Sequence, residues 1–313
     1  MTLRIVITGA TGFIGSAILE EFLRVGAQVI VLLREKSDCQ RISSKTGFES
    51  LIYHSLSDQN IIEGIKAFQP NVFIHCAWRG VGGDDRNEDF QIADNIPLTL
   101  DSVKLAKVTG CKQWIGLGSQ AEYGNQNRVL DEGAPLLPTT IYGRAKLSAG
   151  IAALALCDTY GITGTWMRVF STYGPGDAPY WFIPYVLKEF MANRVPKLTG
   201  CEQLWDYLHV SDAARAIVAV ASNGAGGIFN LGSGTALQLK DYIELMRISV
   251  RSNLSPEYGA IPYRNDQVMH LQADIRKLEK EVGWHPIIQF GEGIDGVVEH
   301  EMQLKNVKSK GIE

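Results

Sequence analysis

Three glycines near the start of the chain restrict its fold more than any other feature. Gly9, Gly12 and Gly15 belong to the run T-G-A-T-G-F-I-G. An apolar, β-branched segment at 3–8 precedes this run, and a segment at 16–25 with apolar residues at helical spacing follows it. The spacing predicts a strand, a tight turn and a helix whose first N–H groups approach a dinucleotide pyrophosphate. The turn residues that we expect to contact this cofactor are Gly9, Thr11, Gly12, Phe13, Ile14 and Gly15.

The same alternation of strand and helix patterns continues over the first 170 residues. Strand patterns lie at 29–33, 72–77, 113–117 and 163–169, and helical patterns at 61–68, 98–108 and 142–160. Such alternation is typical of a parallel sheet with crossover helices, and 313 residues suit one such unit with a smaller lobe. The sequence predicts an α/β fold: a doubly wound parallel Rossmann sheet with a smaller C-terminal substrate-binding lobe.

The strand and helix pattern becomes irregular after Arg168, where glycines and prolines mark the loops. We expect residues 1–170 to form the dinucleotide-binding Rossmann domain, with 206–232 returning to it. Residues 171–205 and 233–313 would form the substrate lobe. Since no flexible linker is visible, the lobe should pack tightly on the first domain.

Charge and cysteine content argue against several classes of function. The formal net charge is −4 and the basic residues are scattered, which disfavours nucleic acid or an anionic membrane as partner. No segment is long and uncharged enough to span a bilayer, and the six histidines lack metal-ligand spacing. The five cysteines are far apart, and the first residues lack the features of a signal peptide. We therefore expect a cytoplasmic protein with a small-molecule substrate and no metal site.

Arg34 bears on the choice between the two nicotinamide dinucleotides. It ends the second predicted strand, about twenty residues after the glycines, where an acidic residue would bind the ribose of NAD. An arginine there accommodates the 2′-phosphate of NADP instead. Arg34 thus favours NADP(H), and NAD(H) is the alternative if this strand-end charge is merely solvated.

Tyr142 and Lys146 stand four residues apart on a predicted helix, so that they project from one face. An ammonium near a phenol lowers the phenol pKa, and such a tyrosine exchanges a proton with a carbonyl or alcohol oxygen during hydride transfer. Ser119 ends a preceding strand, where strand ends converge on the ligand crevice, and would hold the reacting oxygen. We expect Ser119, Tyr142 and Lys146 to be catalytic, the last two also contacting the cofactor.

These motifs together resemble the extended short-chain dehydrogenase/reductase family of the NAD-dependent epimerase/dehydratase type. The resemblance covers almost the whole chain, and further shared motifs are H-C-A-W at 75–78, D-N-I-P-L-T at 94–99, G-S-Q-A-E-Y-G at 118–124, R-V-F-S-T-Y-G-P-G-D at 168–177, D-Y-L-H-V-S-D at 206–212 and R-N-D at 264–266. It implies that Ala77 lines the cofactor path and that Asn95 supports the cofactor site. It also implies a homodimer, in which helices 95–108 and 142–160 pair across a two-fold axis.

The family contains dehydratases, epimerases and reductases of nucleotide sugars. Its dehydratases carry Thr-Asp-Glu where this chain has Ser-Gln-Ala at 119–121, so the acid and base for elimination are absent unless Glu122 replaces them. Its epimerases commonly have an acidic residue in place of Arg34. Segments 173–185 and 258–266 look most like the CDP-abequose synthase-like 4-ketoreductases. We expect NADPH-dependent reduction of a nucleotide-linked 4-keto-6-deoxyhexose; the alternatives are an NAD-dependent nucleotide-sugar epimerase and a dinucleotide sensor without chemistry.

Four residues are expected to contact the substrate. Arg264 matches the family arginine that binds the substrate diphosphate, for which a guanidinium is well shaped. Ser171 stands where the family often has Asn, and Trp205 where it often has Arg, so Trp205 either stacks on a base or sugar or fills core space. Gln120 follows the catalytic serine. The glycine-rich, charged loop 78–90 is either a flexible substrate loop or a solvated connection.

Overall fold

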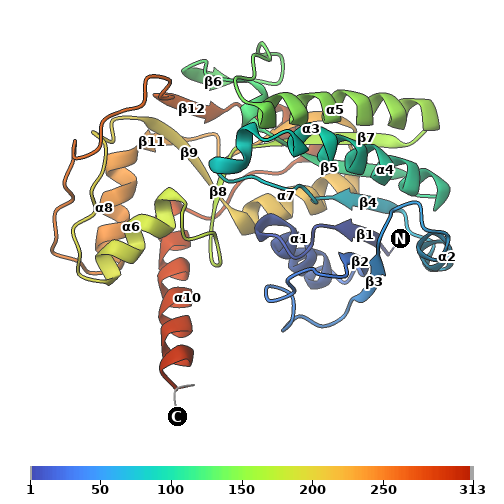
Figure 1. The fold of residues 1–313 in the computed structure, drawn as a ribbon, viewed down its shortest axis with the longest axis horizontal. Helices are drawn as coiled ribbons and strands as arrows, with labels where there is room; N and C mark the ends of the chain where they lie inside the picture. The colour runs from blue at the N-terminus through green and yellow to red at the C-terminus, as the bar shows by residue number, and fades with distance from the viewer. Residues whose placement is uncertain (1, 311–313) are drawn as a thin grey trace.

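Seven parallel strands form the larger sheet of the computed structural model, which describes residues 2–310 and the side chains of 2–305 (Figure 1). Their order is β3-β2-β1-β4-β5-β7-β10, and every neighbouring pair is parallel. This is the doubly wound order, and it confirms the predicted Rossmann sheet. The strands are β1 (Arg4–Thr8), β2 (Gln28–Arg34), β3 (Glu49–Tyr53), β4 (Val72–His75), β5 (Gln113–Ser119), β7 (Thr163–Val169) and β10 (Gly227–Leu231).

Helices cover both faces of this sheet because successive strand residues point to opposite sides. In β1, Ile5 and Ile7 belong to the apolar cluster on one side, and Val6 to the cluster on the other. The first side is covered by α1 (Phe13–Arg24) and α7 (Val210–Asn223). The second is covered by α2 (Gln59–Phe68), α4 (Asn95–Val108) and α5 (Ile141–Tyr160). Short helices η1 (Asp84–Asn87), α3 (Phe90–Ala93) and η2 (Gln120–Glu122) lie in the connections.

A smaller lobe lies beside the Rossmann layers, at the left of Figure 1. Its sheet has the order β11-β9-β12-β6, with β8 also paired to β9. A third apolar cluster fills the space between this sheet and α6, α8 and α10. The remaining elements are β6 (Arg128–Leu130), β8 (Ser171–Tyr173), α6 (Phe182–Met191), β9 (Leu204–His209), β11 (Ala236–Gln238), α8 (Leu239–Ser249), β12 (His270–Ala273), α9 (Arg276–Val282) and α10 (Phe290–Lys310).

The structure distributes two segments differently from the predicted division of the chain. Within 206–232, α7 and β10 belong to the Rossmann layers, whereas the β9 part pairs in the smaller sheet. Conversely β6, at 128–130, lies before residue 170 but pairs with β12 in the smaller sheet. A three-residue strand such as β6 leaves no periodic pattern in the sequence, and the sheet in which β9 pairs is set by contacts with distant segments, which is why the division was incomplete.

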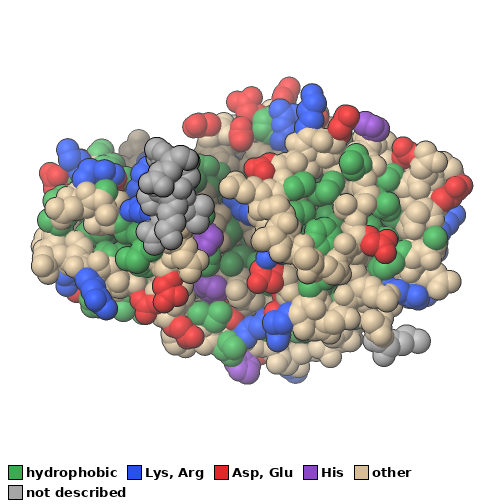
Figure 2. Space-filling view, turned by 90° about the horizontal axis from the view of Figure 1, so that it is seen from below, with side chains coloured by type: hydrophobic (Ala, Val, Ile, Leu, Met, Phe, Trp, Pro, Cys, Tyr) green, Lys and Arg blue, Asp and Glu red, His purple; other side chains and the backbone are tan. Residues whose placement is uncertain are grey.

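The surface carries acidic and basic side chains interspersed, and the face in Figure 2 shows no continuous basic patch. Within residues 2–310, no helix is both long enough and apolar enough to cross a membrane.

Candidate active site

Two positions in the turn after β1 have no space for a side chain and therefore require glycine. Gly9 has φ +74°, and a Cβ there would lie 2.5 Å from the backbone nitrogen of Ala77, just beyond β4. A Cβ on Gly15 would overlap the Gly9 carbonyl. The Gly12 N–H donates to that same carbonyl at 3.0 Å, which closes the turn. The glycines therefore let β1, β4 and the start of α1 approach more closely than side chains would permit.

The N-terminus of α1 is arranged to accept an anion. Its N-cap is Gly12, no side chain caps the first N–H groups, and the first turn has no acidic residue. Uncapped N–H groups and the helix dipole favour a phosphate at such an end. Thr11 lines the adjoining cavity, whereas Phe13 and Ile14, the first helical residues, do not.

A cavity of about 630 Å³ opens at this turn, above the carboxyl ends of β1, β2 and β4. Its volume lies within the range of small-molecule and cofactor sites. The residues expected to bind the cofactor that line it are Gly9, Thr11, Gly12, Arg34, Ala77 and Asn95. The uncapped helix, the glycine turn and this cavity together fit a dinucleotide.

Arg34 ends β2 at the rim of the cavity and is exposed. Its backbone N–H donates to the Ser37 hydroxyl at 3.0 Å, and Ser37 lines the cavity as well. Among the described residues, no carboxylate forms an ion pair with this guanidinium. Its charge is thus available to a ligand in the cavity.

Asn95 holds the backbone at the cavity wall. It is 1% exposed; its Oδ1 accepts from the Arg79 N–H at 2.8 Å, and its Nδ2 donates to the Arg79 carbonyl at 3.0 Å. His75 is also buried, bonded to Thr8 at 2.8 Å and to Thr99 at 3.3 Å. Burial, assisted by the nearby Lys146 charge, lowers the pKa of His75 to about 3, so it is neutral. Among the residues that the structure describes, no group of three or more His, Cys, Asp or Glu could hold a metal ion.

Lys146 is buried on α5 beneath an aromatic ring. Its Nζ donates to the Leu117 carbonyl at 2.7 Å and lies 3.7 Å from the centroid of the Trp78 ring. Burial lowers the pKa of Lys146 to about 7, while the negative charge of Glu122 acts in the opposite direction. Trp78 is fixed in turn, because its Nε1 donates to Gln91 at 2.8 Å.

Ser119 and Tyr142 are 6% and 7% exposed. The Ser119 hydroxyl accepts from the Ala121 N–H at 3.2 Å, which leaves its own proton free to be donated. Burial raises the pKa of Tyr142, and the Ser119 side chain and the Arg86 charge act against this rise. The Nζ of Lys146, on the same helix, is 6.0 Å from the centroid of the Tyr142 ring, and the cation that acts against the rise is Arg86.

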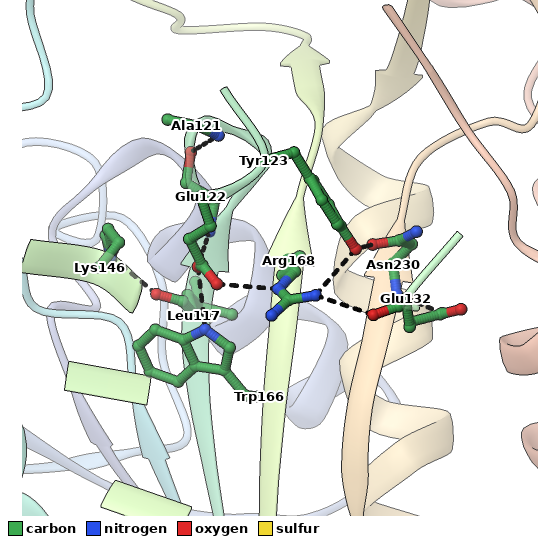
Figure 3. Close-up of polar contacts among 10 residues, drawn as sticks. Leu117, Ala121, Glu122, Tyr123, Glu132, Lys146, Trp166, Arg168 and Asn230 are labelled. Atoms are coloured by element: carbon green, nitrogen blue, oxygen red, sulfur yellow. Dashed lines mark hydrogen bonds and ion pairs between the residues drawn. The ribbon is translucent and has the colours of Figure 1, made fainter. Parts of the chain in front are cut away.

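Glu122 is fully buried. Both oxygens of its carboxylate accept hydrogen bonds (Figure 3). Its Oε1 accepts from the Ser119 N–H at 2.8 Å and from the Trp166 indole at 2.9 Å. Its Oε2 accepts from Arg168 Nε at 2.8 Å. A carboxylate held by three donors and shielded from solvent is not available as the acid or base of an elimination.

Arg168 extends this network toward the edge of the sheet (Figure 3). Its Nη1 donates to the Tyr123 hydroxyl at 3.0 Å and to the Glu132 carbonyl at 3.3 Å. The Tyr123 hydroxyl donates to Asn230 at 2.6 Å, and the Asn230 N–H donates to the Glu132 carboxylate at 2.8 Å. The network therefore joins η2, β7 and β10 next to Ser119.

A model of the NAD-dependent epimerase/dehydratase family matches residues 5–232, well over half of the chain. The chain belongs to this family. The dTDP-glucose 4,6-dehydratase of Streptomyces griseus is 24% identical over 95% of this chain and 94% of its own length. The dTDP-4-dehydro-6-deoxyglucose reductase of Escherichia coli is 24% identical over 94% of this chain and 96% of its own. The fold is similar to a solved UDP-N-acetylglucosamine 4-epimerase from Methanobrevibacter ruminantium M1, with a TM-score of 0.86, 23% identity and coverage of 97% and 100%.

These matches confirm the extended short-chain dehydrogenase/reductase resemblance and make the chain a nicotinamide-dependent enzyme of the epimerase/dehydratase family. The structure brings only some of the four residues expected to bind substrate close to one another. Trp205 on β9 donates to the Ser171 hydroxyl on β8 at 2.8 Å, which links two of them. Gln120 follows Ser119 at the start of η2 and is half-buried. The Arg264 side chain is 76% exposed, 3.8 Å from Asp266, and does not line the cofactor cavity.

Sequence reasoning missed several residues of this epimerase/dehydratase site. Trp78 belongs to the H-C-A-W motif but was assigned no role, although a tryptophan next to Ala77, which is expected to line the cofactor path, was a usable signal. Arg86 lay in a loop with two open interpretations. The pairing of Glu122 with Arg168 had no local signal, because 46 residues separate the partners.

Proposed function

We propose that the protein uses NADPH to reduce the keto group of a nucleotide-linked 4-keto-6-deoxyhexose, as the CDP-abequose synthase-like 4-ketoreductases do. The observation that carries this proposal is the lack of an available carboxylate beside Ser119. Gln120 and Ala121 occupy the dehydratase acid and base positions, and Glu122 is bound by three donors. Proton transfer then depends on Tyr142, which suits a reduction and not an elimination.

Three residues of the site have separate roles in the proposed reaction. Ser119 donates its free hydroxyl proton to the keto oxygen and holds it near Tyr142. Tyr142 gives its phenolic proton to that oxygen. Lys146 supplies positive charge beneath Trp78 and is available to the cofactor ribose. NADPH, when bound at the glycine turn, supplies the hydride.

Arg34 supports NADPH as the cofactor. Its guanidinium has no ion-pair partner among the described residues and stands at the cavity rim where a 2′-phosphate would be recognised. Family membership alone requires only a nicotinamide dinucleotide, so the preference between the two rests on this residue.

The sugar nucleotide would bind between the catalytic residues and the smaller lobe. Ser171 and Trp205 are held together on β8 and β9, and Gln120 lies next to the catalytic serine. Arg264 would reach the diphosphate through a change in its exposed loop. A cytoplasmic location and a homodimer remain predictions that accompany this function.

An NAD-dependent nucleotide-sugar epimerase is the second candidate. An epimerase likewise needs no carboxylate base, and Ser119, Tyr142 and Lys146 would serve it equally. The two activities differ in their use of cofactor, because an epimerase regenerates its cofactor in every turnover and a reductase consumes NADPH. A pure dinucleotide sensor is disfavoured by the buried Ser119, Tyr142 and Lys146, which cofactor binding alone does not require.

The experiment mixes purified protein with NADPH and a nucleotide-linked 4-keto-6-deoxyhexose and follows absorbance at the NADPH maximum. We expect NADPH to disappear only when the keto sugar is present, with one equivalent consumed per sugar reduced. A parallel reaction supplies a nucleotide hexose and no cofactor. The opposing result is interconversion of its C4 epimers there, with no loss of NADPH in the keto-sugar reaction.

A further inference from the structure

Arg86 places a positive charge over the ring of Tyr142, the proposed proton donor. It belongs to η1, in the loop that connects β4 to α3, and η1 packs against α5. Its guanidinium carbon lies 4.6 Å from the centroid of the Tyr142 ring. Trp78 meets the same ring edge-on, with centroids 6.1 Å apart and an interplanar angle of 86°. The phenol is therefore enclosed by a cation and an indole.

The Arg86 charge is not neutralised by a carboxylate in the part of the chain that the structure describes. Its Nε is buried without a hydrogen-bond partner, and no ion pair involves this residue, although Asp84 and Asp85 are its neighbours. Arg79, in the same loop, is by contrast paired with Asp94 at 2.6 Å. The charge of this half-buried guanidinium therefore acts on the ring without being offset by a paired carboxylate.

Other charges around Tyr142 do not replace Arg86. The charged residues of the elements packed around the start of α5 are Arg79, Asp84, Asp85, Arg86, Glu88, Asp89, Asp94, Glu122, Arg144 and Lys146. Of these, Arg86 lowers the pKa of Tyr142 and Glu122 raises it, beside the larger rise caused by burial. Lys146 is 6.0 Å from the ring centroid, bonded to Leu117 and stacked on Trp78.

We propose that Arg86 is a positioning residue that stabilises the phenolate of Tyr142 and holds the ring in place. The four-residue spacing predicted that Lys146 stabilises the phenolate. In this proposal Arg86 provides part of that stabilisation. When Tyr142 gives up its proton in the proposed reduction, the negative charge forms beside an unpaired guanidinium. This inference rests on Tyr142 being the proton donor of the proposed function.

The direct test measures the titration of Tyr142 itself, without substrate. The protein is labelled with 3,5-difluorotyrosine, whose fluorines bring phenol titration into a milder pH range, and is followed by fluorine NMR. The Tyr142 resonance is identified by its loss in Tyr142→Phe. Arg86→Met removes the charge and keeps an apolar stem on the ring, and Arg86→Lys keeps a cation. Arg144→Met is the matched control, because Arg144 is exposed on α5 and donates to the Pro138 carbonyl.

Arg86→Met should raise the titration midpoint of Tyr142 by about 1 pH unit, the usual effect of losing an opposite charge at this range. Arg86→Lys should keep most of the wild-type midpoint, and Arg144→Met all of it. A midpoint in Arg86→Met equal to that of wild type would overturn the proposal. A shift in Arg86→Lys as large as that in Arg86→Met would also overturn it, because packing and not charge would then be responsible.

A kinetic measurement separates this inference from the proposed function. Reduction needs the protonated phenol, so it is lost as pH rises through the Tyr142 pKa, and Arg86→Met should move this loss to higher pH. Absence of any turnover with nucleotide keto sugars refutes the proposed function, while the NMR midpoints still decide the role of Arg86. Turnover with unshifted midpoints and an unshifted pH profile refutes Arg86 alone.

Discussion

Arg168 Nε donates to Glu122 Oε2 at 2.8 Å, and the two side chains are 3% and 1% exposed. The pair joins β7 to η2, directly after the strand that carries Ser119. Because Glu122 also accepts the Ser119 N–H at 2.8 Å, one carboxylate both neutralises the buried guanidinium and fixes the backbone of Ser119, the serine proposed to be catalytic. The ion pair is therefore part of the support for the active site.

Glu122→Gln should destabilise the protein by about 3–5 kcal/mol, because it leaves the Arg168 charge buried without a counter-charge. Urea unfolding followed by circular dichroism measures this change. The control is Glu189→Gln, which breaks a pair with the half-exposed Arg194 and should change the unfolding midpoint little. Equal, small effects of the two substitutions would show that the buried pair does not support the fold.

Gly9→Ala tests the glycine turn against a matched glycine. Gly9 and Gly26 both have positive φ, but a Cβ at Gly26 meets no atom within 4 Å, whereas one at Gly9 would clash with the backbone around Ala77. Gly26→Ala should cost about 1–2 kcal/mol of stability from its backbone conformation alone and leave cofactor binding unchanged. Gly9→Ala should in addition weaken dinucleotide binding on the order of tenfold or more, because the N–H groups expected to face the pyrophosphate would shift. Fluorescence titration with the reduced dinucleotide measures both; unchanged affinity in Gly9→Ala contradicts the assigned binding site.

The sequence predicts the Rossmann sheet well because its signals are local. The glycine spacing, the buried apolar strands and the crossover helices each lie within short windows. β3 was not predicted. It is an edge strand in which only Tyr53 is buried, so Glu49–Tyr53 lacks the apolar run that marks the central strands. α1 begins at Phe13, three residues before its apolar pattern, because the turn geometry makes Gly12 the N-cap.

The site could be predicted only where one segment carries its chemistry. Tyr142 and Lys146 share a helix, so their common face follows from spacing. Their partners come from elsewhere: Arg86 from a loop 56 residues before Tyr142 and Trp78 from the loop that follows β4. Which cation faces the phenol depends on how η1 packs on α5, and no spacing rule contains that information.

Tyr142→Phe should lower turnover by at least ~100-fold, the scale of a positioned general acid. Cofactor binding should be nearly unchanged, because the ring itself is retained. Steady-state kinetics and dinucleotide titration measure the two effects. Tyr160→Phe, at the far end of the same helix, should leave both at wild-type values, and near-normal turnover in Tyr142→Phe would refute its role as proton donor.

Arg34→Asp should shrink or invert a preference for NADPH over NADH. The substitution replaces an attraction for the 2′-phosphate by repulsion and supplies an acceptor for the ribose hydroxyl of NADH. The measurement is kcat/KM for both cofactors at one fixed ionic strength, since exposed charges are screened by salt. Lys112→Asp makes the same change in net charge at the opposite end of the strands, next to β5, and should leave the preference intact. Equal use of both cofactors by wild type and Arg34→Asp would place Arg34 in solvent.

Transfer of a labelled hydride distinguishes net reduction of a keto sugar from isomerisation of a nucleotide sugar. The protein is supplied with NADPH carrying deuterium at the transferable position and with a nucleotide-linked 4-keto-6-deoxyhexose, and the product is analysed by mass spectrometry and NMR. We predict one deuterium at carbon 4 of the sugar and one NADP⁺ for every product molecule. Keto sugar recovered without deuterium and without formation of NADP⁺, together with interconversion of nucleotide hexose C4 epimers in a parallel reaction, would contradict the reductase and establish the epimerase.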